Sequence, residues 1–225
     1  QPPRRPSNLS IAGIVGLARM TDKARAFNNE TLGEYLYGGE SGLDRKILDF
    51  LSISDEQFAE AVEEYDDHTL DTWVIEQSTR TISEIEEFNQ RELSTEPQTE
   101  EYRQRLKDRL AKYAPDRTDI KTVLQSVELD DWGNFWQLDL TKQPPRSPYN
   151  RNIAGIFGIA RMAEKARAAR ADKTGEYKYG QDSGLDRYLL DFLNLSAESF
   201  QQGAVDNPND LELSDWVLLN IEKDP

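Results

Sequence analysis

Residues 11–29 of the chain read IAGIVGLARMTDKARAFNN, and residues 153–171 read IAGIFGIARMAEKARAARA. Further along, GEYLYGGESGLDRKILDFL, which begins at Gly33, has the counterpart GEYKYGQDSGLDRYLLDFL. Residues 11–58 align with 153–200 at a constant offset of 142 without a gap, and 29 of these 48 positions are identical. This period far exceeds the roughly 20–50 residues of solenoid repeats, so the pattern indicates a duplicated domain.

The match continues on both sides of this block. Upstream, the segment Q-P-P-R occurs at 1–4 and again at 143–146. Downstream, after one inserted residue, Trp73 in the first copy faces Trp216 in the second. Both tryptophans lie in apolar helical patterns, and we predict that each anchors the core of its copy.

A stretch at 78–138 lies between the copies, and the second copy has no counterpart to it. We therefore predict a first domain at 1–138, in which this stretch adds C-terminal helices, and a shorter second domain at 139–225. The two domains are expected to pack on each other about a pseudo-two-fold axis. Such an intrachain pseudo-dimer is compatible with a monomeric chain.

Apolar residues recur at helical spacing along most of the chain, and no stretch shows sustained alternation of apolar and polar residues. Capping boxes mark two helix starts, where Ser54 faces Gln57 and Thr81 faces Glu84. We therefore predict an all-α fold with at most a short β-hairpin in each copy, at Glu34–Tyr37 in the first. The predicted helices cover 11–27 and its copy 153–169, 43–51, the segments that follow Ser54, Thr81 and Thr99, 70–77, and a short piece within 119–127.

Pro97 and Pro115 delimit one helix of the unique stretch, which Thr99 is expected to cap. Its larger apolar residues share one stripe, a pattern typical of a helix that packs on a core. The stripe consists of Tyr102, Leu106, Leu110 and Tyr113.

The chain carries 27 Lys and Arg residues against 42 Asp and Glu residues, which gives a formal net charge of -15. A field of this sign repels phosphate backbones and anionic lipid surfaces. We therefore expect neither a nucleic acid nor a membrane as a partner. No apolar run approaches the roughly 18–20 residues that cross a bilayer, and no secretory signal is visible.

The chain has no cysteine and a single histidine, His68. This composition excludes disulfides, thiolate metal sites and multi-histidine metal sites. We predict neither a metal nor another cofactor. A cysteine-free chain also fits a reducing compartment, so the predicted localisation is cytoplasmic.

Polar side chains that are unchanged in both copies are the best candidates for a site, because duplicated copies can drift independently. Arg19 and Lys23 are four residues apart and share one helix face. Arginine offers a bidentate fork and lysine a point charge, so with nearby tyrosines they predict a pocket for a carboxylate or phosphate. The matched set is Arg19, Lys23, Arg25, Tyr35, Tyr37, Asp44 and Arg45, with partners Arg161, Lys165, Arg167, Tyr177, Tyr179, Asp186 and Arg187.

The same residues also fit a purely structural role. Arg19 and Arg25 lie within reach of Asp22 and could form surface ion pairs worth about 0–1 kcal/mol each. Tyr35 and Tyr37 could pack in the core, with their hydroxyls satisfied by Asp44 or by the backbone. The sequence leaves both interpretations open.

Several strings shared by the two copies resemble one known family. They are A-R-M-x-D/E-K-A-R-A around Arg19 and Arg161, then G-E-Y-x-Y, L-D and D-F-L, and a tryptophan beyond them. In this combination the chain resembles a bacterial family described as a domain of unknown function, DUF5069, here as a tandem duplication with a long first and a short second copy. The resemblance extends to residues 115–120 and 144–148 and supports a boundary near 139. It implies no catalytic residue and no activity.

Three classes of function follow from these features. The first is a binding or accessory module with one pocket for a small anionic ligand in each repeat. The second is an enzyme that performs acid–base chemistry on a small carboxylate or phosphate, with Lys23 or Tyr35 as acid or base, Asp44 orienting it and Arg19 holding the substrate. The third is a protein-interaction scaffold, which predicts a large exposed apolar patch.

Overall fold

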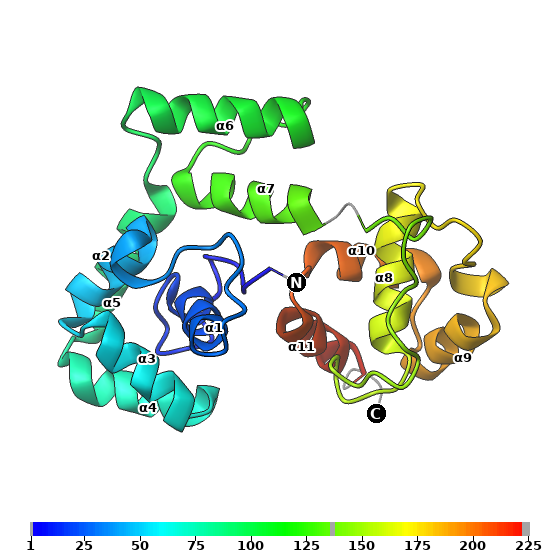
Figure 1. The fold of residues 1–225 in the computed structure, drawn as a ribbon, viewed down its shortest axis with the longest axis horizontal. Helices are drawn as coiled ribbons and strands as arrows, with labels where there is room; N and C mark the ends of the chain where they lie inside the picture. Colours follow the sequence, from blue (N-terminus) through cyan, green and yellow to red (C-terminus); the bar gives the residue numbers. More distant parts are fainter. Residues whose placement is uncertain (1, 136–137, 222–225) are drawn as a thin grey trace. The chain divides into compact units, whose positions relative to one another are not determined.

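The computed structural model describes residues 2–135 and 138–221, which form helices, turns and loops and no strand (Figure 1). The prediction of an all-α fold is therefore confirmed. The chain divides into two compact units, one of residues 3–130 and one of residues 131–225 together with residues 1–2. Within the described residues, no helix has the length and apolar character needed to cross a membrane.

The first unit contains the first repeat and most of the unique stretch. Its helices are α1 (Leu17–Asn28), the short 3₁₀ helix η1 (Gly38–Glu40), α2 (Gly42–Leu51), α3 (Asp55–Glu64), α4 (Asp67–Ser78), α5 (Ile82–Ser94), α6 (Glu100–Tyr113) and α7 (Val123–Phe135), which runs across the division at residue 130. The second unit repeats the first part of this order. It contains α8 (Ile159–Arg170), η2 (Gly180–Asp182), α9 (Gly184–Leu193), α10 (Ala197–Asp206) and α11 (Asp210–Ile221).

Each unit is built around the helix that carries the matched cations. In the first unit, α1 packs against α2 and α3, and the core also takes residues from α4 and Phe88 from α5. In the second unit, α8 packs on α10, and the core takes residues from α9 and α11. Trp73 and Trp216 pack against these two cores, although both rings stay partly exposed.

The capping signals locate the helix starts well. Ser54 and Thr81 form the two predicted capping boxes, and Thr99 caps α6 as predicted. The apolar stripe of α6 is not a core face, however, because no residue of this fully described helix is buried. Residues 34–37 are turn and loop rather than a hairpin strand.

The prediction of a helix over 11–27 is wrong for its first six residues. Residues 11–13 and 15–16 form turns, Gly16 donates its amide to the Pro6 carbonyl at 2.7 Å, and α1 begins only at Leu17. Gly16 has φ +80° and its counterpart Gly158 has φ +82°. The left-handed backbone at these glycines sets where each helix begins, whereas apolar spacing alone would extend the helix further toward the N-terminus.

Alanine at position 16 should destabilise the first unit by at least about 1 kcal/mol, because an L-residue is strained at this φ. A Cβ there would also lie 2.8 Å from Cδ1 of Ile47. Gly13→Ala separates the two causes, since Gly13 has φ +63° but a Cβ would meet nothing within 4 Å. Thermal unfolding measures both variants, and equal losses would leave no role for the contact with Ile47.

Candidate functional site

The matched polar residues do not gather around one hollow but separate into three groups in each unit. One group is a buried lysine–aspartate pair, one is an arginine stacked on a tyrosine, and one is a cluster of arginines and carboxylates at the C-terminal half of the first repeat helix. Arg45 and Arg187, also matched, are exposed.

The first group, which we name the lysine clip, consists of Lys23, Ser41 and Asp44. The Lys23 ammonium donates to the Leu36 carbonyl at 2.9 Å, to Ser41 Oγ at 3.1 Å and to Asp44 Oδ1 at 2.7 Å. The other oxygen of Asp44 accepts the Gly38 amide at 3.2 Å. Burial raises the pKa of the Asp44 carboxyl above its ordinary value, and Lys23 opposes that shift.

The second unit has the same clip in Lys165, Ser183 and Asp186. Lys165 donates to the Lys178 carbonyl at 3.0 Å, to Ser183 Oγ at 3.0 Å and to Asp186 Oδ1 at 2.6 Å. An ammonium has three hydrogens, and each of the two lysines engages all three within the protein. The clip therefore ties the first helix of each repeat to the loop and helix that follow, and leaves the ammonium no donor for a ligand or an acid–base step.

The second group stacks an arginine on a tyrosine. The Arg19 guanidinium lies 5.4 Å from the centre of the Tyr35 ring, and Arg161 lies at the same distance from Tyr177. Arg19 donates to the Arg4 carbonyl at 3.3 Å. Cation–π contacts contribute about 0.5–1 kcal/mol at exposed sites and about 2 kcal/mol where the cation is desolvated, as the buried Arg19 is. The pair thus holds the loop before η1 on the helix.

Tyr37 and Tyr179 use their hydroxyls inside the fold. Tyr37 donates to the Asp55 carbonyl at 2.8 Å, and Tyr179 donates to the Ala197 carbonyl at 2.6 Å. Burial, with nearby carboxylates such as Asp44, raises the pKa of the Tyr37 phenol well above its ordinary value. Burial and Asp186 raise the pKa of the Tyr179 phenol in the same way. Neither phenol is poised to exchange a proton near neutral pH.

The third group contains an arginine from the Q-P-P-R segment. In the first unit, Arg4 pairs with Asp22 at 2.8 Å and with Asp67 at 2.7 Å. Arg25 donates to the other oxygen of Asp67 at 2.6 Å and to the Tyr65 carbonyl at 3.2 Å. Asp67 is thus shared between two guanidinium groups, and both cations have a carboxylate partner.

In the second unit the corresponding carboxylate serves only one arginine. Arg146 donates to both oxygens of Asp210, at 2.5 Å and 3.1 Å, and its Nε lies 2.7 Å from Glu164 Oε1. Arg167, the counterpart of Arg25, donates Nε to the Ala204 carbonyl at 2.8 Å and Nη2 to the Asn207 carbonyl at 3.0 Å. Within the described residues, no carboxylate lies at ion-pairing distance from this buried guanidinium.

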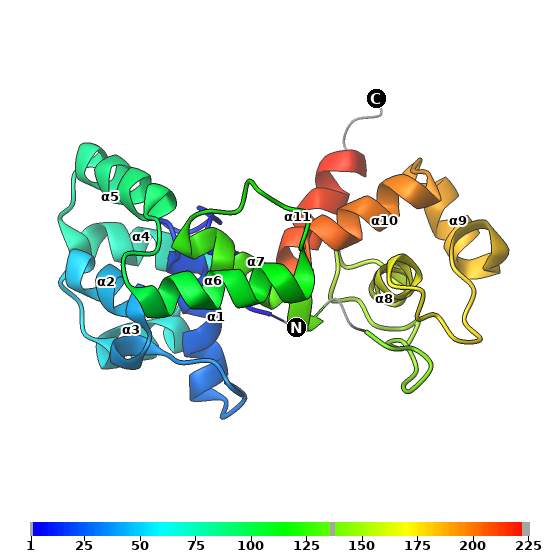
Figure 2. The ribbon, with the colours of Figure 1, turned by 90° about the horizontal axis from the view of Figure 1, so that it is seen from above.

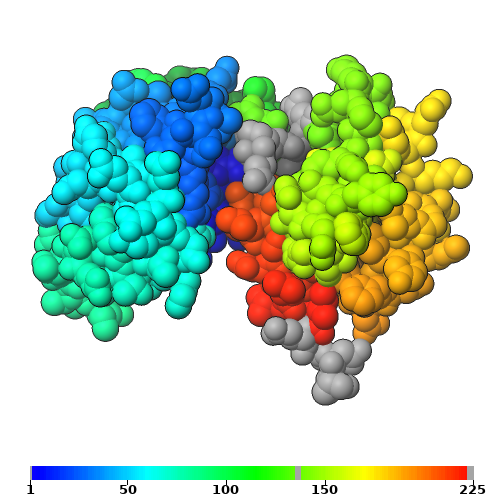
Figure 3. Space-filling model, turned by 60° about the horizontal axis from the view of Figure 1, so that its bottom comes forward, coloured from blue at the N-terminus to red at the C-terminus, as the bar shows by residue number. Residues whose placement is uncertain are grey.

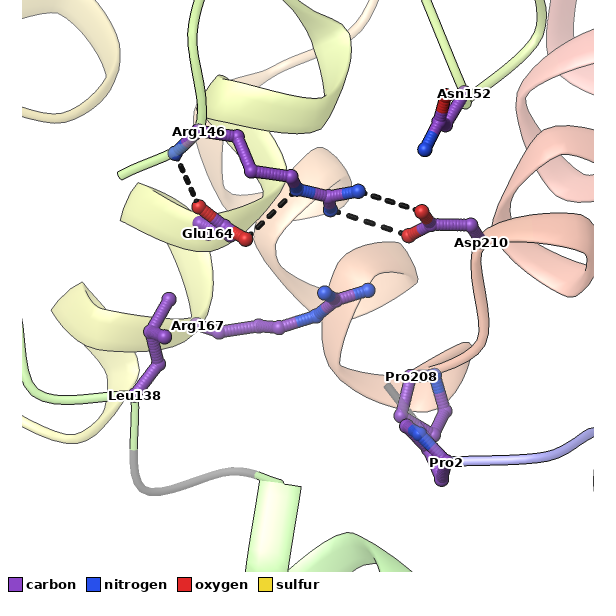
Figure 4. Close-up of a pocket in the computed structure, with 8 residues that line it drawn as sticks. All are labelled: Pro2, Leu138, Arg146, Asn152, Glu164, Arg167, Pro208 and Asp210. Atoms are coloured by element: carbon purple, nitrogen blue, oxygen red, sulfur yellow. Dashed lines mark hydrogen bonds and ion pairs between the residues drawn. The ribbon is translucent and has the colours of Figure 1, made fainter. Parts of the chain in front are cut away.

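A pocket of about 340 Å³ opens beside these two arginines (Figure 4). Figure 4 shows the Arg167 guanidinium reaching from α8 toward the Arg146–Asp210 pair, with Glu164 on the other side of Arg146. The described lining residues are Pro2, Leu138, Arg146, Asn152, Glu164, Arg167, Pro208 and Asp210.

The comparison with known families agrees with the repeat. The family model described as a domain of unknown function (DUF5069) matches residues 1–132 and 142–224. The chain belongs to the DUF5069 family. The two matched segments are consistent with two copies of the domain. No curated protein matches the chain.

The two arginines of the second DUF5069 repeat differ in how their charges are balanced. Burial acts to lower the pKa of Arg146, but Asp210 and Glu164 outweigh it and raise the pKa. For Arg167 burial dominates and lowers the pKa to about 10, although Asp210 acts against it. Arg167 therefore stays protonated at neutral pH while its environment disfavours the charge.

The loop that precedes Asp210 in the second DUF5069 repeat is one residue longer than the loop that precedes Asp67 in the first. Residues 65–66 join α3 to α4, whereas residues 207–209 join α10 to α11. In both repeats the arginine donates to the carbonyl of the first loop residue, Tyr65 or Asn207, so the extra residue lies between that carbonyl and the aspartate that follows the loop.

Sequence reasoning missed half of the arginine–carboxylate cluster. It selected Arg25 and Arg167 but not Arg4, Arg146 or the aspartates after the third helix of each repeat. A signal was present, because the Q-P-P-R match reaches both N-terminal arginines. Their partners lie 63 and 64 residues away, beyond the reach of helical spacing. Within the described residues, no group of His, Asp and Glu side chains could hold a metal ion.

Proposed function

We propose that the second DUF5069 repeat binds a small anionic ligand, a carboxylate or a phosphate, in the pocket beside Arg146 and Arg167. The observation that carries the proposal is the Arg167 guanidinium, which is buried at the pocket wall without a carboxylate partner among the described residues. A buried charge is costly unless it is paired, and a bound anion would provide the missing partner.

The donor set of the pocket suits an anion of modest charge. Nη1 of Arg167 donates to no protein group in the described part of the chain, since the hydrogen bonds of this side chain leave from Nε and Nη2. The nearby charges of Arg146, Glu164 and Asp210 sum to minus one, so with Arg167 the cluster is neutral. One monoanion on Nη1 therefore fits the local charge better than a polyanion.

The size of the pocket sets the class of ligand. Ligand pockets usually hold about 300–1,000 Å³, and the present one, at about 340 Å³, lies at the lower end. Leu138 and Pro208 supply apolar walls beside the charged residues. A small organic acid or inorganic phosphate fits within these dimensions.

The same argument does not extend to the first repeat. There Arg25 already donates to Asp67, which also holds Arg4, so both guanidinium groups are balanced inside the fold. We therefore assign the ligand to the second repeat alone, and the first repeat supplies a matched control.

Arg167→Met should raise the dissociation constant of the anion about tenfold to hundredfold, because a charge-assisted hydrogen bond contributes about 1.5–3 kcal/mol. Titration calorimetry with a panel of small monocarboxylates and inorganic phosphate measures the loss. Arg25→Met, which changes the corresponding residue of the first repeat, should leave the dissociation constant unchanged. Equal affinity in wild type and Arg167→Met, or no heat from any member of the panel, would contradict the assignment.

A further inference from the structure

The first repeat has a covering helix with no counterpart among the described residues of the second repeat. In the first unit, the Phe88 ring of α5 stacks on Phe50 of α2 with centroids 4.4 Å apart and an interplanar angle of 19°. Figure 2 shows α5 at the outer edge of this unit, next to α4. Phe88 is only 1% exposed and belongs to the core. The α5 helix therefore closes one face of the repeat rather than merely touching it.

Polar side chains of α5 complete this contact. Asn89 accepts the Val15 amide at 2.8 Å through Oδ1 and donates to the Gly13 carbonyl at 2.7 Å through Nδ2. Glu92 accepts from Lys46 at 2.7 Å. An aromatic ring, an adjacent amide and a carboxylate one turn later thus bind α2 and the turns before α1.

The corresponding face of the second repeat is open. Phe192, the counterpart of Phe50, is 59% exposed, and Tyr188, the counterpart of Lys46, is 70% exposed. Phe157 replaces the buried Val15 and is 53% exposed, and Leu185 adds to the same face. We name this apolar face, formed by Phe157, Leu185, Tyr188 and Phe192, the α9 face.

The backbone before α8 contains the counterparts of the two backbone groups that Asn89 binds in the first repeat. Figure 3 shows this segment, coloured yellow-green, at the surface of the second unit. The Gly155 carbonyl accepts from Arg151 at 2.9 Å, in the place where Gly13 accepts from Asn89. The Phe157 amide, the counterpart of the Val15 amide, donates to no protein group in the described ranges.

We propose that the α9 face docks an acidic amphipathic helix of a partner protein, with the side-chain pattern of α5. Its aromatic residue would stack on Phe192, and the adjacent amide side chain would accept the Phe157 amide. Its carboxylate one turn later would accept from the Tyr188 hydroxyl, which stands where Lys46 binds Glu92. Helix-in-groove recognition of this kind uses anchors at such spacings.

The contact made by α5 favours a helix over a second copy of this chain. Two α9 faces packed on each other would bring Phe192 and Tyr188 together, but the face carries no amide side chain to accept the Phe157 amide. The positive charge of Arg151, which lies 4.6 Å from the Phe157 ring centre, also favours an acidic partner. The α5 sequence itself is acidic, with Glu84, Glu86, Glu87 and Glu92.

The test uses the full chain and a labelled peptide of residues 79–95, stapled between positions 86 and 90, which are both exposed in α5. We expect saturable binding by fluorescence anisotropy. Phe192→Ala in the chain, and Phe88→Ala or Asn89→Ala in the peptide, should each weaken binding at least tenfold. Phe27→Ala changes an exposed phenylalanine of the first repeat and should leave binding unchanged.

Two results would overturn the proposal. One is the lack of peptide binding, or binding that Phe192→Ala does not weaken, since the peptide could then only replace α5 on the first repeat. The other is a concentration-dependent dimer in sedimentation that Phe192→Ala abolishes, because the α9 face would then bind a second copy. Phe192 is exposed, so its variant should fold, and circular dichroism verifies this.

Discussion

Replacing Lys23 by methionine should lower the free energy of unfolding of the first unit by about 3–5 kcal/mol. The change leaves Asp44 fully buried without its cation, and removing one partner of a buried pair costs this much. Hydrogen–deuterium exchange measures the effect locally, and protection should fall in α1 and α2 while α8 and α9 keep theirs. Lys165→Met should lower amide protection in α8 and α9 and leave α1 and α2 unchanged, because the second clip has the same contacts.

Two controls isolate the buried charge as the cause. Lys142→Met removes an ion pair with Asp139 in which the lysine is 78% exposed, and such a pair contributes about 0–1 kcal/mol. The double variant Lys23→Met with Asp44→Leu removes both charges and should recover a large part of the loss. A cost below about 1 kcal/mol for Lys23→Met alone would show that Asp44 finds another partner or is protonated in the fold.

The lysine clip also shows how far comparison of the two copies can lead. Unchanged Lys23 and Asp44 pointed to a shared constraint, and the structure has that constraint in both units. The sequence could not distinguish a ligand pocket from a set of internal hydrogen bonds, because two of the three groups that accept from the Lys23 ammonium come from a loop. The Leu36 carbonyl and Ser41 hydroxyl reach Lys23 only when residues 33–41 fold back on α1.

Local signals and long-range signals differed in reliability for a physical reason. Ser54 and Thr81 cap their helices through bonds to residues three positions on, so the sequence shows both partners at once. The burial of Phe50 depends instead on α5, which lies further along the chain, and its counterpart Phe192 is exposed. Likewise, Asp210 follows a loop that is one residue longer than the loop before Asp67, and it pairs with Arg146 but not with Arg167.

Phe88→Ala should destabilise the first unit by about 3–5 kcal/mol, the usual cost of removing a fully buried phenylalanine side chain. The truncation also exposes Phe50 and frees α5, so amide protection should fall first in residues 82–94. Urea unfolding followed by circular dichroism measures the loss of stability, and exchange measurements locate it.

The matched variant in the second unit makes this result informative about both repeats. Phe192 corresponds to Phe50 but is exposed, with no covering helix among the described residues, and a substitution at an exposed site usually changes stability by no more than about 0.5 kcal/mol. Phe50→Ala should therefore cost several times more than Phe192→Ala in the isolated chain. A loss for Phe192→Ala that equals the loss for Phe50→Ala would mean that the α9 face is already covered in solution, and the docking helix would then have no free surface to bind.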